Sequence, residues 1–244
     1  MKRFWMRALL CFALSAALLT GCALSPSSQP AESPTDPLTG QELVWPGQRP
    51  VAITIDNAAA STTQWGLSTA SLVLEALTAQ QQATRLCLVY PAVGAVPQVG
   101  PVSAGQDLYW RLLVGQQVLP VQRGGGQFDQ NYLDYYSLRA VDALEVGTNA
   151  FSCETNWQNV PLWHTSGAAL SGVLGSLNIS PALTESRVTD TSSSSSDSES
   201  GTLLSVPNLL PMQENGKLPD ADASDAMSVR VQFDAQNATG FTYD

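Results

Sequence analysis

The stretch Val51-Ala52-Ile53-Thr54-Ile55-Asp56-Asn57 decides the fold class that we predict. Its first five residues are apolar or β-branched without interruption, a pattern typical of a strand buried on both faces of a sheet. Similar short runs over 84–90, 118–121 and 138–144 predict three more strands. Strands of this kind pack in the centre of a layered domain, so their connections decide the architecture.

The connections between these strands are predicted to be helical, because apolar residues recur there every three or four positions. Helices are expected over 67–77, over 104–114, around 128–136 and over 167–177. The second of them is predicted to turn Leu108, Leu112 and Leu113 inward. Strands that alternate with helices favour an α/β layered domain with a mostly parallel sheet, which we place at 49–184.

Residues 1–22 are typical of a targeting segment. Lys2 and Arg3 precede a twelve-residue apolar run from Ala8 to Leu19, which is shorter than the roughly 20 residues that a membrane-spanning helix needs. The run ends in Leu19-Thr20-Gly21-Cys22, which resembles the bacterial lipobox. In that motif the cysteine sulfur is lipidated, and the cysteine becomes the N-terminal residue of the mature protein. The alternative is an ordinary secretory signal peptide with an incidental Cys22.

The remainder of the chain divides by composition. Residues 23–48 are rich in Ser and Pro and predict a flexible tether. Residues 185–227 are rich in Ser and acidic residues, and we interpret them as a disordered insertion. Residues 228–244 alternate in polarity like a β hairpin, which would begin a further C-terminal domain. Because the sequence stops inside this pattern, we expect the native protein to continue past Asp244.

Charge and composition exclude several classes of function. The chain carries 11 Lys and Arg against 21 Asp and Glu, a net charge of −10, whereas nucleic-acid binding needs clustered basic residues. The one histidine, His164, has no partner at a recognised metal-ligand spacing, so neither a metal nor another cofactor is predicted. Cys87 and Cys153 could form a disulfide or remain free thiols.

Two motifs follow predicted strands and are candidate ligand-binding sites. Asp56 and Asn57 end the first strand, and ligands of open α/β sheets bind outside such ends. They could hold a hydroxylated ligand or a cation, or they could simply form a turn. The second motif is Arg123-Gly124-Gly125-Gly126, whose backbone amides could hold an anion at a helix N-terminus. No Lys-Ser/Thr follows it, so it is not a nucleotide-binding P-loop, and a tight turn is the alternative.

Glu75 and Arg85 complete the set of candidate residues. They could form a structural ion pair between the predicted helix and the next strand, or Glu75 could join Asp56 as a second catalytic carboxylate. Aromatic residues sufficient for a sugar-binding groove are also present, although the same residues can fill a core. These aromatic residues are Trp65, Trp110, Trp157, Trp163, Tyr132, Tyr135 and Tyr136.

Several motifs together resemble those of the YerB-like lipoproteins, a bacterial family of unknown function. They are Pro37-Leu38-Thr39-Gly40, 49–57, Gln64-Trp65-Gly66-Leu67-Ser68, Glu75, Thr84-Arg85 and Gly100-Pro101-Val102. The resemblance covers about 37–180 and implies a lipoprotein signal, a polar tether and an α/β body, but no activity. The chain departs from the family pattern at Ser103-Ala104-Gly105-Gln106, where members usually have Arg-Ser-Ala-Arg, and at 79–83, where they are acidic. These changes imply a divergent member with altered or reduced activity.

The function that we expect is that of a membrane-anchored extracytoplasmic lipoprotein. It would be a binding or accessory protein of the cell envelope, held to the membrane through Cys22, with a cell-wall glycan, a peptide or an envelope protein as its partner. The alternative is an extracytoplasmic hydrolase or transferase that uses Asp56 and Glu75 as paired carboxylates on envelope glycans or peptides.

Overall fold

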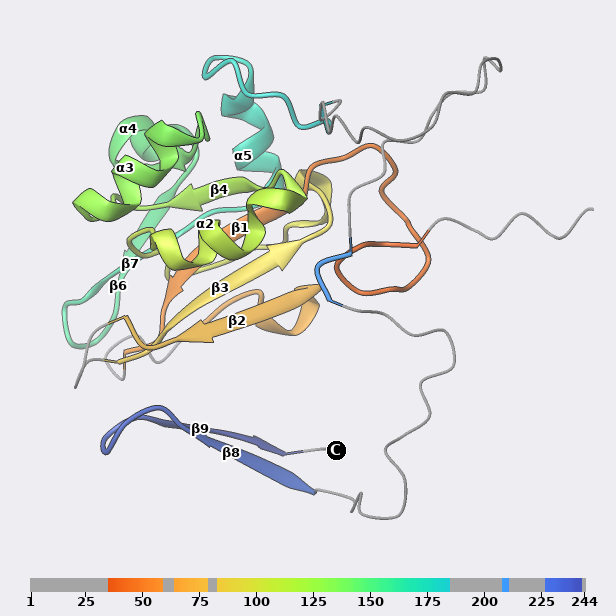
Figure 1. Ribbon diagram of the computed structural model, residues 1–244. Helices are drawn as coiled ribbons and strands as arrows, with labels where there is room; N and C mark the ends of the chain where they lie inside the picture. The colour runs from red at the N-terminus through yellow and green to blue at the C-terminus, as the bar shows by residue number, and fades with distance from the viewer. Residues whose placement is uncertain (1–34, 59–63, 79–82, 185–207, 211–226, 243–244) are drawn as a thin grey trace, which may run out of the picture. The chain divides into compact units, whose positions relative to one another are not determined.

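The computed structural model describes residues 35–58, 64–78, 83–184, 208–210 and 227–242 (Figure 1). All of them belong to one compact unit of the chain, which begins at Thr35. The predicted signal peptide, the lipobox with Cys22 and most of the Ser-rich insertion lie outside the described residues. Within that insertion, 208–210 is described, and the Leu209 amide donates to the Pro37 carbonyl at 3.0 Å.

A five-stranded sheet with the order β2-β3-β1-β4-β5 forms the centre of the fold. Its strands are β1 (Val51–Asp56), β2 (Leu72–Ala76), β3 (Arg85–Tyr90), β4 (Leu119–Gln122) and β5 (Val141–Asp142). Strand β1 is parallel to β4, and β4 is parallel to β5, whereas β3 is antiparallel to both β1 and β2. The predicted α/β class is confirmed. The mostly parallel arrangement is not, because two of the four pairings are antiparallel.

Strand β2 replaces the helix that the sequence predicts over 67–77. Only Leu67–Thr69 is helical, as one 3-10 turn (η1), and the chain then pairs with β3. The side chains of Leu72, Leu74 and Ala76 pack against the same hydrophobic cluster. These residues repeat every two positions, so the segment carries a strand pattern as well as a helix pattern. Because β3 offers a free edge, pairing satisfies the backbone hydrogen bonds of β2.

The other predicted helices are present. They are α2 (Asp107–Leu113), α3 (Gln127–Tyr135) and α5 (Gly167–Leu174), and a short α4 (Ala143–Val146) occupies part of the strand predicted over 138–144. Ser166 is the N-cap of α5, and its hydroxyl accepts a hydrogen bond from the Ala169 amide. Helix α2 buries Tyr109, Trp110 and Leu113. The inward orientation predicted for Leu108 and Leu112 is therefore wrong.

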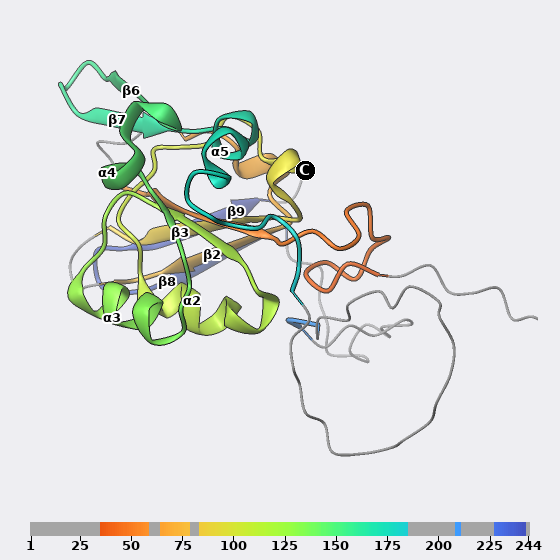
Figure 2. The ribbon, with the colours of Figure 1, turned by 90° about the horizontal axis from the view of Figure 1, so that it is seen from above.

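The sheet has a hydrophobic cluster on each face, and Figure 2 shows α2 and α3 on one side of it and α5 on the other. On the α2–α3 side, Ala52, Cys87 and Val89 pack with residues of the two helices. On the α5 side, Ile53, Ile55 and Leu88 pack with residues of that helix. Each fully buried Val, Ile or Leu side chain among them contributes about 1.5–3 kcal/mol relative to exposure. Burial on both faces accounts for the uninterrupted apolar run of β1.

The remaining elements are two hairpins and three 3-10 turns. The first hairpin joins β6 (Ser152–Thr155) to β7 (Pro161–His164), and the second joins β8 (Ser228–Gln232) to β9 (Ala238–Thr242). The 3-10 turns are η2 (Val93–Ala95), η3 (Val114–Gln116) and η4 (Gly147–Asn149). Cys87 is buried in β3 and Cys153 is exposed on β6, and both are free thiols. None of the helices in the described part of the chain has the length and apolar character that a bilayer crossing requires.

Candidate functional site

Three polar side chains that are distant in sequence meet where β1 ends and β3 begins. The side-chain amide of Asn57 donates to Thr84 Oγ1 at 2.7 Å and to Glu75 Oε1 at 3.2 Å. The Thr84 hydroxyl in turn donates to Glu75 Oε1 at 2.5 Å. The strand order explains the meeting, because β3 lies between β1 and β2 and brings all three residues to one edge of the sheet.

Gln64 fixes the orientation of the Asn57 amide. Its Nε2 donates to Asn57 Oδ1 at 2.9 Å and to the backbone carbonyl of Asp56 at 2.9 Å. With its oxygen engaged by Gln64, Asn57 can turn only its nitrogen towards Thr84 and Glu75. We did not predict a site role for Gln64, although it lies in one of the motifs that carry the family resemblance.

Glu75 links this group to the second hairpin. The Thr239 hydroxyl of β9 donates to Glu75 Oε1 at 2.7 Å, so that a single carboxylate oxygen accepts from Asn57, Thr84 and Thr239. Hydrogen bonds to a charged acceptor are among the stronger ones in proteins. We call Asn57, Gln64, Glu75, Thr84 and Thr239 the edge cluster.

Asp56 and Arg85 form an ion pair on the opposite face of the sheet. They are directly opposite each other in the β1–β3 register, and their side chains are 23% and 29% exposed. Glu75 pairs with Leu86, one position along β3, and successive residues of a strand point to opposite faces. Arg85 therefore pairs with Asp56 rather than with Glu75. The two carboxylates proposed for catalysis, Asp56 and Glu75, lie on different faces.

A small pocket lies beside the edge cluster, with a volume of about 130 Å³. Asn57, Ala83 and Thr84 form one wall, and residues 236–239 at the tip of the second hairpin form the other. Its lining is mostly polar, and five of the seven lining residues carry a side-chain amide or hydroxyl group, which can both donate and accept hydrogen bonds. The pocket is therefore suited to a polar, uncharged group of a ligand.

The Arg123–Gly126 loop follows β4, which is the parallel neighbour of β1, so it reaches the same edge of the sheet. Gly124 has a φ of 69°, which favours glycine. Its amide donates to Asp142 Oδ1 at 2.8 Å, and its carbonyl accepts from the Gly105 amide at 2.8 Å. The guanidinium of Arg123 lies over the Trp163 ring, 5.2 Å from its centroid. These contacts are those of a tight turn, which is one of our two interpretations of this loop.

Beneath this loop lies a buried carboxylate that the sequence analysis missed. Asp129 is 2% exposed and accepts hydrogen bonds from Trp110 Nε1 at 2.5 Å and from Gln122 Nε2 at 3.0 Å. Burial raises the pKa of Asp129, although these two hydrogen bonds oppose the shift. A Cβ at Gly125 would lie 1.9 Å from Asp129 Oδ2, and one at Gly105 would lie 1.9 Å from Gln122 Oε1. Packing against Asp129 explains Gly125, and packing against the Gln122 carboxamide explains Gly105.

His164 contacts an aromatic ring and an acid. Its ring centroid is 5.4 Å from that of Trp65, and its Nε2 lies 3.4 Å from Glu154 Oε1. Within the described ranges, no group of three or more His, Cys, Asp or Glu side chains is arranged to hold a metal ion.

Comparison with protein families identifies the family of the chain. Residues 38–175 match the family described as "Protein of unknown function (DUF3048) N-terminal domain". The chain belongs to this family. Four of the five residues of the edge cluster lie within the matched range, and Thr239 lies beyond it.

A solved relative of this DUF3048 chain is the YerB protein from Bacillus subtilis, whose crystal structure is 23% identical in sequence and superposes with a TM-score of 0.52. The similarity covers 62% of this chain and 52% of that one, so the chain spans about half the length of the structure it matches. At this identity the similarity establishes the fold alone. No curated protein matches the chain.

Proposed function

We propose that the protein is a lipid-anchored extracytoplasmic binding protein that holds a polar ligand of the cell envelope, a glycan or a peptide, at the edge cluster. The observation that supports this most directly is the polar pocket formed by Asn57 and Thr84 together with 236–239. Segments distant in sequence contribute amide and hydroxyl groups to one small volume, as in sites that orient a ligand by hydrogen bonds.

The size of the pocket limits what it can hold. Whole small-molecule sites usually measure about 300–1,000 Å³, whereas this pocket measures about 130 Å³. It would therefore take one hydroxylated or amide-bearing end of a longer ligand, with the remainder lying outside. Glycans and peptides are long ligands that carry such groups.

The positions of the acidic groups favour binding over hydrolysis or group transfer. General acid–base catalysis requires both groups within hydrogen-bond reach of the substrate. Asp56 is engaged by Arg85 on one face of the sheet, while Glu75 accepts three hydrogen bonds on the other. The paired-carboxylate mechanism therefore has no support in this geometry.

The location that we propose rests on the sequence of residues 1–48. The apolar run and the lipobox would direct lipidation to Cys22, and the acyl chains of a lipidated terminus are sufficient for stable anchoring. Metabolic labelling with an alkyne analogue of palmitate tests this. We expect the wild-type chain to be labelled and to sediment with membranes, and the Cys22→Ser chain to lose both properties. An equally labelled Cys22→Ser chain would disprove the anchor.

The binding site is tested by screening the full chain, purified in detergent, against a panel of cell-wall glycan and peptide fragments. We expect Asn57→Ala to lose binding, because it removes the amide that lines the pocket. Asn131→Ala is the matched control, since Asn131 is exposed on α3 and does not line the pocket. Undiminished binding by the Asn57→Ala chain would refute the site.

A further inference from the structure

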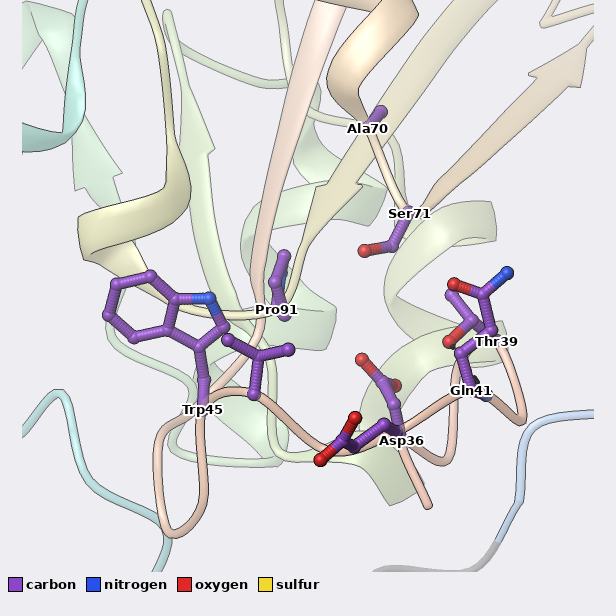
Figure 3. Close-up of a pocket in the computed structure, with 9 residues that line it drawn as sticks. Asp36, Thr39, Gln41, Trp45, Ala70, Ser71 and Pro91 are labelled. Carbon is purple, nitrogen blue, oxygen red and sulfur yellow. Dashed lines mark hydrogen bonds between the residues drawn. The ribbon is translucent and has the colours of Figure 1, made fainter.

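A second pocket, separate from the edge cluster, lies between the loop 36–45 and the ends of two strands. Its volume is about 340 Å³. Figure 3 shows Trp45 on one side of it and Thr39 and Gln41 on the other, with Ser71 and Pro91 between them. None of the site residues predicted from the sequence lines this pocket. The loop 36–45 lies within the segment 23–48 that we predicted to be a tether.

The loop that forms one wall is held in shape by its own hydrogen bonds. Asp36 Oδ1 accepts from the Leu38 amide at 2.7 Å, and the Asp36 carbonyl accepts from the amides of Thr39 and Gly40. The Asp36 amide donates to the Gln41 carbonyl at 2.7 Å, which closes the loop. A wall that is ordered before binding reduces the entropy that a ligand must offset.

Trp45 is fixed from behind by a glycine. A Cβ on Gly94 would lie 3.0 Å from the Trp45 ring, so the indole packs directly against the backbone of η2. The exposed large apolar side chain of Val44 lies beside it in the lining. An indole fixed in this way offers a flat apolar surface to a ligand without losing side-chain freedom on binding.

The lining of this pocket is acidic. Asp36 and Glu42 both contribute, and of the described residues that line it, none is Lys, Arg or His. Asp36 is only 8% exposed, and among the described residues hydrogen bonds engage only its Oδ1. A nearly buried carboxylate with one oxygen left for the pocket favours a donor that carries a positive charge.

We propose that this pocket binds an amino sugar. Its ammonium group would lie at Asp36 and Glu42, and the C–H face of its ring would stack on Trp45. Its hydroxyls would bond with Thr39, Gln41 and Ser71. The volume lies within the range of small-ligand sites. An organic cation fits better than a metal ion, because the pocket offers two carboxylates together with an aromatic face.

Calorimetric titration of the full chain in detergent tests this proposal. The probe is a glucosamine trimer at slightly acidic pH, where its amines are protonated. The comparison probe is the N-acetylglucosamine trimer, which has the same rings but no charge. We expect the acetylated trimer to bind at least about tenfold more weakly, because it loses a charge-assisted hydrogen bond.

Two variants locate the binding. Glu42→Gln keeps the shape of an exposed side chain and is expected to weaken binding about tenfold. Trp45→Ala is expected to abolish measurable binding. The matched controls are Glu145→Gln and Trp157→Ala, both exposed and outside the pocket, and each is expected to bind as the wild type does.

Three results would overturn the proposal. These are no binding of the glucosamine trimer, equal binding of the acetylated trimer, and wild-type affinity in both the Glu42→Gln and the Trp45→Ala chains. Because the edge cluster contributes no residue to this pocket, none of these results bears on the binding function proposed above.

Discussion

Replacing Gly125 by Ala is expected to destabilise the protein strongly, although the change adds only one methyl group. The new Cβ would lie 1.9 Å from Asp129 Oδ2 and 2.7 Å from Asp129 Cγ. Asp129 cannot move aside freely, since its two oxygens are held by Trp110 and Gln122. Either the loop shifts or these hydrogen bonds break.

The magnitude follows from these two costs. Overpacking by one methyl group costs about 1–3 kcal/mol, and a hydrogen bond lost from a buried carboxylate adds about 1.5–3 kcal/mol. We therefore expect Gly125→Ala to lower the free energy of unfolding by about 2.5–6 kcal/mol. Urea denaturation followed by tryptophan fluorescence measures it as a lower midpoint with an unchanged slope.

The matched control is Gly172→Ala in helix α5. Nothing lies within 4 Å of the position of its Cβ, and an alanine inside a helix is more stable than a glycine by about 0.5–1 kcal/mol. The two glycine substitutions should therefore change the free energy of unfolding in opposite directions. If the stability of Gly125→Ala stayed within about 0.5 kcal/mol of the wild type, packing against Asp129 would not explain this glycine. The anion-binding loop would then be the better interpretation.

Three further outcomes are expected. Because burial raises the pKa of Asp129 in the folded state, its stabilising contribution is present at low pH and is lost as the pH rises through the raised value. Urea midpoints measured from low to neutral pH should therefore fall in the wild type relative to Asp129→Asn, and parallel curves would contradict this. Thr239→Val removes one hydrogen bond to Glu75 and should speed amide exchange in β8 and β9 but not in β1; exchange that speeds equally in all three strands would show that the bond is not local to the hairpin. In the native, unreduced chain, alkylation should modify Cys153 quickly and Cys87 only after unfolding, because Cys87 is buried and its thiol pKa is raised; protection of both would indicate a bridge.

Where burial alone decides the structure, the sequence was sufficient to predict it. The run from Val51 to Ile55 is apolar because side chains pack against both of its faces, and the pattern predicts the strand without knowledge of its neighbours. The same holds for α5, whose cap at Ser166 is a local hydrogen bond within one turn.

Segments with two compatible patterns needed their neighbours to decide between them. Residues 72–76 fit both a helix face and one face of a strand, and the free edge of β3 selected the strand. In α2 the pattern favoured Leu108 and Leu112, but Tyr109 and Trp110 are buried instead. Asp129 of α3 accepts a hydrogen bond from the Trp110 indole. That partner lies on another helix and cannot be deduced from the periodicity of α2.

Two residues of the edge cluster, Asn57 and Glu75, were candidates from the sequence, but the grouping of the polar residues was not predicted. Asp56, Asn57, Glu75 and Arg85 were each candidates, and the register of three strands places Asp56 with Arg85 on one face and Asn57 with Glu75 on the other. A shift of one residue in that register would exchange the groups. Trp45 was missed because the glycine that fixes it lies at position 94.

By itself the sequence determined the α/β class, the resemblance to a family and the residues that carry polar chemistry, because hydrophobic periodicity and composition are local properties of the chain. Only the tertiary structure decided which of those residues act together. Hydrogen bonds and ion pairs extend about 3 Å, so a change of strand order or register is enough to separate one pair of side chains and to bring another pair into contact.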